Sequence, residues 1–392
     1  MESILLKDII QKPISGEWGL EDLYGTGIPV LRTANFTNEG IINFENVVTR
    51  NISPSKLKGK LLQKGDILLE KSGGSDRQPV GRVVYFDGQA DKYGFNNFTS
   101  ALRISDLTMW NPKYIFYALY ANYHHGGTRK YENKTTGLHN LKVDLFIRSF
   151  SVPYATLIKQ NEIVKKLDLL NHLENVCEVQ LQKLDELIKS RFIEMFGDLI
   201  NEPKYPGIKL GSLGVMITGG TPSRKHDEYY GGNIPFISTP CLGSNFISEK
   251  NVQNYLTEAG VKNSATHKIP PYSLMVGNRV GVGKSSINTC EMCTNQDILS
   301  FVDIDTSRFD LLFLKKVIDQ YSPYFDEHKR GATIQGVPSK VIKDSMVPDV
   351  PLEMQKRYTA LVKQSDKSKM AVQKSLDELE TLKKSLMQTY FG

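Results

Sequence analysis

Two long stretches of the chain place apolar residues at alternating steps of four and three positions. In residues 157–196 the series is Ile163, Leu167, Leu170, Cys177, Leu181, Leu184, Ile188 and Met195, interrupted by Glu174 and Arg191. In residues 352–391 it is Tyr358, Val362, Val372, Leu376, Leu379, Leu386 and Tyr390, interrupted by Ser365, Lys369 and Lys383. The other positions are rich in Lys, Glu, Asp and Gln. This spacing is typical of an amphipathic helix whose apolar stripe packs against a partner helix.

The two stretches are copies of each other. Adding 195 to a residue number leads from Leu157 to Leu352, from Gln160 to Gln355 and from Phe196-Gly197 to Phe391-Gly392. A register kept without a gap over about 45 residues indicates an internal duplication. Because neither helix can bury its stripe alone, we expect the two to pack on each other as an antiparallel pair. At about 1.5 Å per residue, such a pair makes a rod of about 50 Å. The alternative is two surface helices, each docked on its own domain.

The chain between these helices predicts two globular domains of one plan. Short apolar runs punctuated by Gly, Pro and Asn indicate strands in both, and Ile28-Pro29-Val30-Leu31 occupies the same place as Ile234-Pro235-Phe236-Ile237. Helical segments are expected over residues 114–123 and 311–318, with a polar loop over 124–140. The predicted fold class is α/β (α+β), with domains at 1–153 and 199–350 and spacer helices at 154–198 and 351–392.

Composition and charge narrow the class of protein only slightly. The 392 residues carry a net charge of +6, which permits binding to nucleic acid without indicating it. Four cysteines in so long a chain are typical of a reduced intracellular protein. We see no secretory signal and no apolar run long enough to span a membrane. A cytoplasmic, soluble protein without membrane contact is therefore expected.

Motifs for catalysis or cofactor binding are weak. Val282-Gly283-Lys284-Ser285 suggests a phosphate-binding loop, but the glycine that the pattern requires five residues before Gly283 is Asn278. A glycine-rich turn between strands is the favoured interpretation. Cys290-Glu291-Met292-Cys293 lacks the second cysteine pair of a zinc site. We expect no metal, no cofactor and no catalytic residue.

Several segments resemble one known family. These are Thr218–Arg224 before Tyr229–Ile237, then Gly277–Lys284 and Thr333–Lys340, and finally Val350–Gln355. In this order they are similar to the specificity subunit of type I restriction-modification systems, and the similarity is strongest in the second half. The first domain departs from the pattern, with Ser15-Gly16-Glu17-Trp18-Gly19 in place of the Gly-Gly-Thr-Pro loop.

The resemblance implies DNA binding without catalysis. Each domain would be a target recognition domain for one half of a bipartite site in double-stranded DNA, and the helical pair would set the gap. The implied partners are two modification (methyltransferase) subunits, which dock on the helices, and restriction (motor and nuclease) subunits.

Candidate contact residues follow from residue type, since Arg, Lys, Asn and Gln read base edges and cations bind phosphates. For the first domain we expect Lys71, Arg77, Gln78, Arg82, Arg129, Lys130 and Lys134. For the second we expect Ser223, Arg224, Lys225, Tyr229, Asn278, Arg279, Lys284, Lys329 and Arg330. The helix-pair interface is expected at Leu167, Leu170, Leu181, Leu184, Ile188, Val372, Leu376, Leu379 and Leu386.

Two alternatives remain open on the sequence. One is the recognition subunit of a related restriction-modification system that lacks the motor. The other is a scaffold or adaptor that does not bind DNA, with a coiled coil for assembly and two domains for peptides or sugars. Salt dependence separates DNA binding from the scaffold alternative, because binding to several DNA phosphates weakens steeply as the salt concentration rises.

Overall fold

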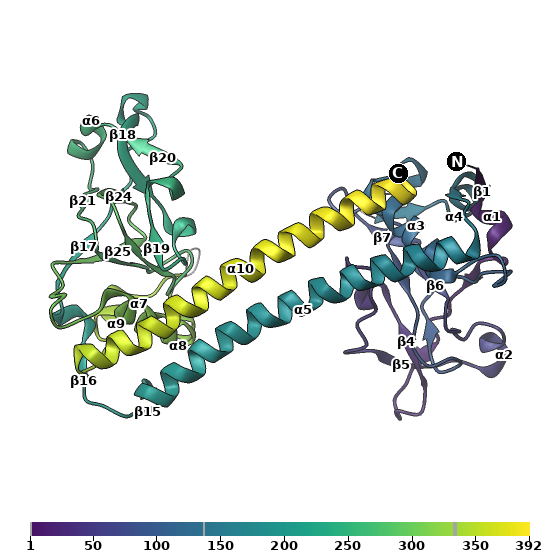
Figure 1. Cartoon of the computed structure of the whole chain (residues 1–392), viewed down its shortest axis with the longest axis horizontal. Helices are drawn as coiled ribbons and strands as arrows, with labels where there is room; N and C mark the ends of the chain where they lie inside the picture. Colours follow the sequence, from purple (N-terminus) through teal and green to yellow (C-terminus); the bar gives the residue numbers. More distant parts are fainter. Residues whose placement is uncertain (1, 136–137, 332–334) are drawn as a thin grey trace. The chain divides into compact units, whose positions relative to one another are not determined.

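The computed structural model describes residues 2–135, 138–331 and 335–392 (Figure 1). Two compact units divide the chain. Unit 1 comprises Met1–Glu178 with Lys374–Gly392, and unit 2 comprises Val179–Gln373. The long helices α5 (Leu157–Phe196) and α10 (Leu352–Phe391) therefore contribute one half each to both units. The four domain boundaries expected from the sequence stay predictions.

Unit 1 is built on two four-stranded sheets. The first has the order β2 (Ile14–Ser15), β10 (Thr99–Leu102), β6 (Ile67–Glu70) and β8 (Val83–Tyr85), all antiparallel. The second has the order β3 (Leu20–Glu21), β5 (Val48–Asn51), β4 (Ile28–Leu31) and β9 (Gly94–Phe95), with β4 and β9 parallel. Helix α3 (Pro112–His124) packs on β8. Its apolar residues are buried almost all round, which explains why no clear periodicity marks this helix.

Smaller elements complete unit 1. Strands β1 (Ser3–Leu5) and β13 (Ser151–Pro153) pair antiparallel just before α5 begins. Short helices are α1 (Leu6–Ile9), α2 (Pro54–Leu57) and α4 (Val143–Ser149). A third sheet has the order β11 (Glu132–Thr135), β12 (Leu138–Leu141) and β7 (Ser72–Gly74).

The polar loop expected over residues 124–140 is wrong, because β11 and most of β12 lie there. The buried faces of these strands carry Glu132 and His139, whose side chains bond to each other at 2.9 Å. A polar pair in the interior removes the apolar alternation by which a strand is detected in sequence.

Unit 2 repeats the plan of unit 1 with longer strands. Its antiparallel core sheet has the order β17 (Val215–Thr218), β25 (Ile298–Val302), β22 (Leu274–Gly277) and β23 (Ser285–Asn288), and β19 (Phe246–Ile247) adds a parallel edge. The second sheet has the order β20 (Asn254–Leu256), β18 (Tyr230–Ile237), β24 (Met292–Thr294) and β21 (Lys268–Ile269). Strands β18 and β24 are parallel, as β4 and β9 are in unit 1.

The remaining helices and strands of unit 2 follow the same equivalence. Strands β16 (Gly207–Lys209) and β26 (Met346–Pro348) pair before α10, as β1 and β13 do before α5. Helix α7 (Leu311–Gln320) packs on β22 and β23 and is followed by α8 (Ser322–Glu327) and α9 (Ser339–Lys343). The expectation of two domains with one fold is confirmed by this shared strand order.

Each unit shows the two long helices packed antiparallel. In unit 1, Leu167 and Leu170 of α5 lie in one core with Met387 of α10, and Leu379 and Leu386 pack against that core. In unit 2, Phe192 lies 5.4 Å from Tyr358, ring centroid to ring centroid. The N-terminal half of α5 thus meets the C-terminal half of α10, and the reverse holds in unit 2.

The polar positions that interrupt the stripe pair with each other. Lys383 donates to Glu174 at 2.6 Å, and the two side chains are only 18% and 14% exposed. Lys369 forms an ion pair with Asp185. At the end of α5 the stripe passes from Ile188 to the buried Phe192 and leaves Arg191 exposed. A straight helix drifts relative to a strict seven-residue repeat, which accounts for this shift.

A buried glutamine joins each long helix to its domain by the same hydrogen bonds. Gln160 Oε1 accepts from the backbone N–H of Asn111 at 2.8 Å, and its Nε2 donates to the carbonyls of Met109 and Ala155. Gln355, at the duplicated position, accepts from Asp310 N–H at 2.9 Å and donates to Arg308 and Val350. Both side chains are fully buried. The duplication therefore preserves a specific joint as well as a helix.

No helix among the described residues combines the length and the apolar character needed to cross a membrane.

Candidate nucleic-acid interface

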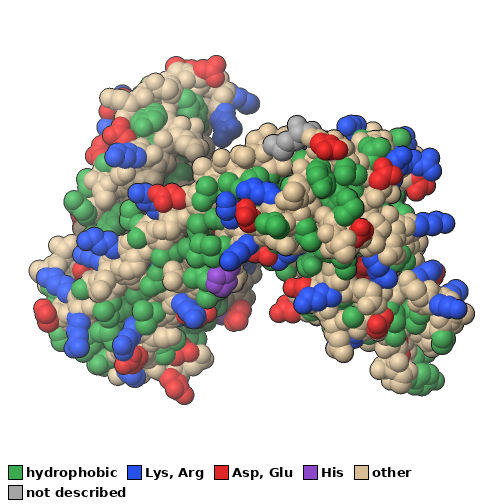
Figure 2. Space-filling model, turned by 45° about the vertical axis from the view of Figure 1, so that its right-hand side comes forward, with side chains coloured by type: hydrophobic (Ala, Val, Ile, Leu, Met, Phe, Trp, Pro, Cys, Tyr) green, Lys and Arg blue, Asp and Glu red, His purple; other side chains and the backbone are tan. Residues whose placement is uncertain are grey.

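On the face shown in Figure 2, charge alone marks no binding surface. Lys and Arg side chains lie there among Asp and Glu side chains, and no single large basic patch is visible. The candidate surface must therefore be built from loops whose side chains the fold brings together.

In unit 2 two expected loops are held side by side. Residues 278–284 form the turn between β22 and β23, as the preferred interpretation of the glycine-rich motif requires. The carbonyl of Asn278 accepts from Val337 N–H at 2.7 Å, and Arg330 forms a backbone bridge with Gly336. A Cβ on Gly336 would lie 2.7 Å from Arg279 Cγ and 2.8 Å from the Asn278 oxygen. Only glycine permits this approach, which brings Arg279 and Arg330 onto neighbouring segments.

Acidic residues position several of these cations. Arg279 Nη1 lies 3.5 Å from Asp297 Oδ1 and its side chain remains 52% exposed. Lys329 pairs with Asp326 at 2.5 Å, whereas Lys284 is exposed at the end of its turn. Arg279 and Lys284 therefore keep surface available for a ligand, and Lys329 is partly neutralised.

The segment before β18 supplies a second group in unit 2. Ser223, Arg224 and Lys225 are exposed, and the ring of Tyr229 stacks on His226 with centroids 4.8 Å apart. The segment is anchored by Thr221, which donates to Gln296 Oε1 at 2.5 Å. Within the described residues, no contact joins Arg224 or Lys225 to Arg279, so the structure does not bring those predicted residues together.

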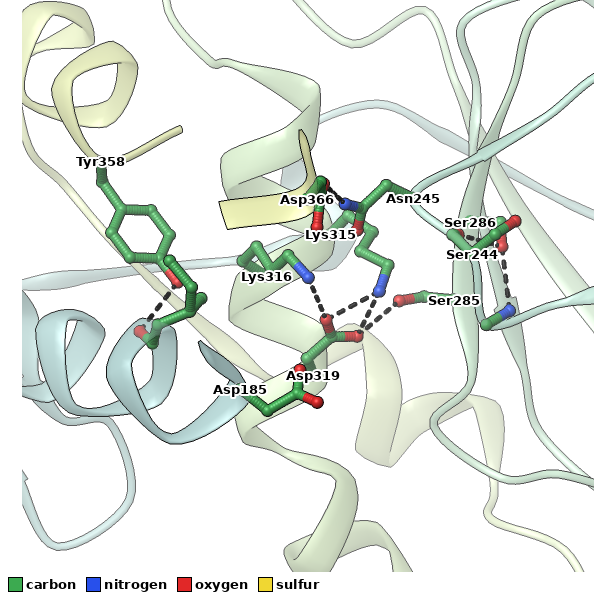
Figure 3. Close-up of polar contacts among 12 residues, drawn as sticks. Asp185, Ser244, Asn245, Ser285, Ser286, Lys315, Lys316, Asp319, Tyr358 and Asp366 are labelled. Carbon is green, nitrogen blue, oxygen red and sulfur yellow. Dashed lines mark hydrogen bonds and ion pairs between the residues drawn. The ribbon is translucent and has the colours of Figure 1, made fainter. Parts of the chain in front are cut away.

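Next to Lys284, a polar cluster attaches the sheet of unit 2 to its helices (Figure 3). Asp319 of α7 accepts from Lys315 at 2.7 and 2.9 Å and from Ser285 Oγ at 3.2 Å. Burial is the main cause that lowers the pKa of Lys315, and the Asp319 charge opposes it. Asn245 donates to Asp366 of α10 at 2.6 Å. A cavity of about 470 Å³ lies beside these residues and is open to Lys284.

In unit 1 the loop after β7 presents Arg77 and Gln78 to solvent. Glu132 fixes this loop, since its Oε1 accepts from Val80 N–H at 3.1 Å while its Oε2 bonds to His139. The loop is therefore held from below by a buried carboxylate.

Arg82 is a correction to the sequence prediction of an exposed loop residue. Its guanidinium donates to both carboxylate oxygens of Glu70, at 3.0 and 2.9 Å, and to the carbonyls of Thr33 and Phe36 at 3.3 Å. The side chain is only 15% exposed. Glu70 is the last residue of the buried strand β6, and its buried carboxylate requires a cationic partner. Arg82 supplies that charge and so stabilises the loop from the interior of the domain.

The remaining candidates of unit 1 differ in their surroundings. Arg129 and Lys130 are exposed, and Lys130 Nζ lies 5.0 Å from the ring centroid of Tyr131. The side chain of Lys134 lies outside the described residues. Lys71 donates to Ser15 Oγ at 2.8 Å, and burial, followed by the nearby charge of Lys60, lowers its pKa.

Sequence reasoning missed the surroundings of Lys71. Lys60 pairs with Glu17, and the Arg50 guanidinium lies 4.3 Å from the ring centroid of Trp18. A signal existed, because this segment precedes Ile28-Pro29 as residues 221–229 precede Ile234-Pro235.

Comparisons with known proteins agree with this arrangement. Residues 205–381 match the type I restriction modification DNA specificity domain. A type I restriction enzyme MjaIX specificity subunit from Methanocaldococcus jannaschii is 26% identical over 155 residues, which are 39% of this chain and 36% of that protein. The HindI specificity subunit from Haemophilus influenzae is 29% identical over 124 residues, 32% of this chain and 27% of that protein.

The fold is shared over the whole chain. The S subunit of a type I restriction-modification system from M. genitalium superposes with a TM-score of 0.59 at 12% identity, covering 100% of this chain and 96% of that one.

Residues 205–381 therefore carry a type I restriction modification DNA specificity domain.

The matches in sequence span about a third of the two curated relatives and lie in a minority of this chain. The similarity in sequence is carried by the DNA specificity domain at 205–381, and the solved S subunit adds a similarity of fold over the full length. The individual contact residues expected from the sequence stay predictions.

Proposed function

We propose that the chain reads a bipartite target in double-stranded DNA, with one half-site for each domain. The observation that supports this most directly is the duplication of one fold with different loops. Both units keep the same strand order and the same glutamine joint, yet the segments expected at DNA differ in sequence and in anchoring residues. Two recognition surfaces on one scaffold suit two unlike half-sites.

We further propose that α5 and α10 set the number of unread base pairs and provide the docking surface for two modification subunits. Methylation of adenine and cleavage would belong to modification and restriction subunits, and this chain would supply recognition only. Half-site spacing is then a geometric property of the helices, as it is in dimeric DNA-binding proteins.

The first experiment is methylation mapping in cells that carry the modification genes with and without this gene. A two-part motif with a fixed gap is expected only when this gene is present. A motif that persists without the gene, or a continuous motif without a gap, would contradict the proposal.

The second experiment lengthens the helical pair. The Glu174–Lys383 ion pair sets the register, so the insertions must lie opposite each other: seven residues after Cys177 and seven after Leu379. Both insertions preserve the apolar seam. We expect a longer gap and unchanged half-sites, whereas a single insertion should abolish activity because the register is lost. Changed half-sites with the original gap would refute the role of the helices.

The dependence of DNA affinity on salt concentration distinguishes the proposed function from the scaffold alternative. For the full chain, alone and with modification subunits, DNA affinity should fall steeply between low and moderate salt, because bound phosphates release counterions. A protein scaffold for peptides or sugars would show no such dependence and no preference for duplex DNA.

A further inference from the structure

Residues 16–27 of unit 1, between β2 and β4, occupy the place that residues 219–229 occupy in unit 2. Residues 219–229 connect β17 of the antiparallel sheet to β18 of the second sheet, and residues 16–27 connect β2 to β4, the equivalent of β18, with the short edge strand β3 between them. In unit 2 this segment exposes Arg224 and Lys225 beside the stacked ring of Tyr229. The equivalent segment of unit 1 contains no cation of its own, so cations must come from elsewhere in the fold.

Three lysines from other parts of unit 1 gather along the start of this segment. Lys71 donates to Ser15 Oγ at 2.8 Å, and Lys60 forms an ion pair with Glu17. The hydrogen bond from Lys60 is the largest cause that lowers the pKa of Glu17, and the charge of Lys56 acts in the same direction. Lys60 and Lys56 therefore act on the Glu17 carboxylate, while Lys71 lies beside Ser15 and close to Lys60, so lysines outnumber carboxylates at the start of this segment.

At Trp18, the residue after Glu17, an arginine is held against the aromatic ring. The Arg50 guanidinium lies 4.3 Å from the Trp18 ring centroid, and it donates to the carbonyls of Trp18 and Gly19 at 3.2 and 3.3 Å. Neither of these two partners carries a negative charge, and the acidic residue at the position opposite Arg50 in the β3–β5 pairing is Glu21. The charge of Arg50 is thus held in place and is not neutralised by these contacts.

A rigid turn projects beside Arg50. Asp22 accepts from the backbone N–H groups of Thr26 and Gly27 at 3.1 and 2.8 Å, and Gly25 has φ +69°. The turn exposes 87% of Tyr24 and 75% of Leu23. Large apolar side chains at the tip of a fixed turn indicate a contact surface, and here they lie next to cations.

We propose that residues 15–27 with Arg50, Lys56, Lys60 and Lys71, here named the basic turn surface, contact duplex DNA. The lysines and Arg50 would bind phosphates, and Tyr24 would enter the adjacent groove. Lysine is depleted at protein–protein interfaces, whereas a lysine row beside an exposed aromatic suits a polyanion with a groove. This inference depends on the proposed function and assigns the first domain a contact surface equivalent to residues 221–229 of the second.

The charge test uses substitutions of opposite sign. Measured by fluorescence anisotropy on a duplex that contains the mapped target, Lys56→Gln should weaken binding and reduce the salt slope by about 0.9 for one lost phosphate contact. Glu17→Gln removes the carboxylate that pairs with Lys60 and should tighten binding. Lys7→Gln, an exposed lysine of α1, is the matched control and should change neither quantity.

The aromatic test uses Tyr24 and Trp18. Tyr24→Ala should lower affinity about tenfold, as loss of an aromatic contact to nucleic acid typically does. The chain has two tryptophans, and Trp110 is only 3% exposed. DNA should therefore protect Trp18 from acrylamide quenching, and Trp18→Phe should remove the DNA-dependent change in fluorescence.

The outcomes separate the inference from the proposed function. If the wild-type chain with its modification subunits binds the target, but Lys56→Gln, Glu17→Gln and Tyr24→Ala bind equally well, the basic turn surface is not a DNA contact. If these variants bind DNA normally and fail to assemble with modification subunits, the surface binds protein and the inference is overturned. If the wild-type assembly shows no salt-dependent binding to duplex DNA, the proposed function itself fails.

Discussion

Replacement of either buried glutamine should loosen one domain from the long helices. We consider Gln160→Met and Gln355→Met, since methionine has nearly the shape of glutamine and cannot form its hydrogen bonds. Each change removes three hydrogen bonds and leaves one backbone N–H and two carbonyls without their partner. An unpaired buried polar group costs about 1–3 kcal/mol. Because the carbonyls can recover part of this cost, we expect a loss of about 3–5 kcal/mol.

The loss should be local and should be the same at both positions. At about 2–4 °C per kcal/mol for domains of 150–250 residues, the unit that carries the substitution should melt roughly 10 °C lower, and differential scanning calorimetry should show the other unit unchanged. Hydrogen exchange followed by mass spectrometry gives a second measurement. The N–H of Asn111 should lose protection in Gln160→Met, and the N–H of Asp310 should do so in Gln355→Met.

The control is an exposed glutamine of the same helix. Gln182→Met lies on the solvent side of α5 and should change neither the melting temperature nor the exchange at Asn111. If Gln160→Met melts within 2 °C of wild type, about the shift expected for 1 kcal/mol or less, the joint contributes little and the reasoning from its hydrogen bonds is refuted. Equal loss of stability in both units after one substitution would refute the claim that each glutamine serves its own domain.

Three further predictions concern other contacts. Glu174→Ala leaves Lys383 unpaired between the two long helices and should lower the free energy of unfolding in urea by about 1–3 kcal/mol, less than for a fully buried pair because both groups keep some exposure. The double exchange Glu174→Lys with Lys383→Glu should recover most of this loss. Additive losses from the two single changes would argue against the pairing. Gly336→Val should displace the 278–284 turn and lower DNA affinity at least tenfold, while unit 2 stays folded with a slightly lower unfolding midpoint, because the nearest atoms that the new side chain would meet belong to this turn. Normal DNA affinity would exclude this turn from the interface. Burial raises the pKa of the Cys293 thiol to about 11, so at pH 8 this thiol should react with a disulfide reagent only after unfolding, whereas the partly buried Cys241 should react in the native chain. Rapid labelling of the native chain that disappears in Cys293→Ser would contradict the burial of Cys293.

The architecture could be predicted because duplication appears in the sequence as a fixed offset. The apolar steps from Ile163 to Leu170 and from Leu376 to Leu386 are set by helix geometry alone, and strand runs such as Ile28–Leu31 are bounded by turn residues. These signals are local. The antiparallel register was harder to predict. It is defined by the Glu174–Lys383 pair, and in the sequence each of these residues only interrupts the apolar series of its own helix.

The candidate interface could be predicted only as a set of residue types. Arg82 satisfies every criterion for a contact residue in sequence, yet Glu70, twelve positions earlier, takes its charge into the interior. Lys60 and Arg50 were missed for the opposite reason: each is unremarkable in its own segment, and only the fold brings it to Glu17 and Trp18. Whether a cation is free to bind depends on long-range partners, and a single sequence does not specify them.

The same reasoning explains why the two domains can diverge in their surface loops while the scaffold stays duplicated. In unit 1 a loop is fixed from below by Glu132, and in unit 2 the corresponding turn is fixed by Asn278, Asp297 and Gly336. The supporting contacts are made largely by backbone groups and buried side chains, which leaves exposed positions such as Arg77, Gln78 and Arg279 free to change. A substitution at an exposed position should then alter target preference without loss of stability, whereas a substitution at Glu132 or Gly336 should weaken recognition of every sequence. This division separates residues that specify the target from residues that hold them in place, and it does so before any target is known.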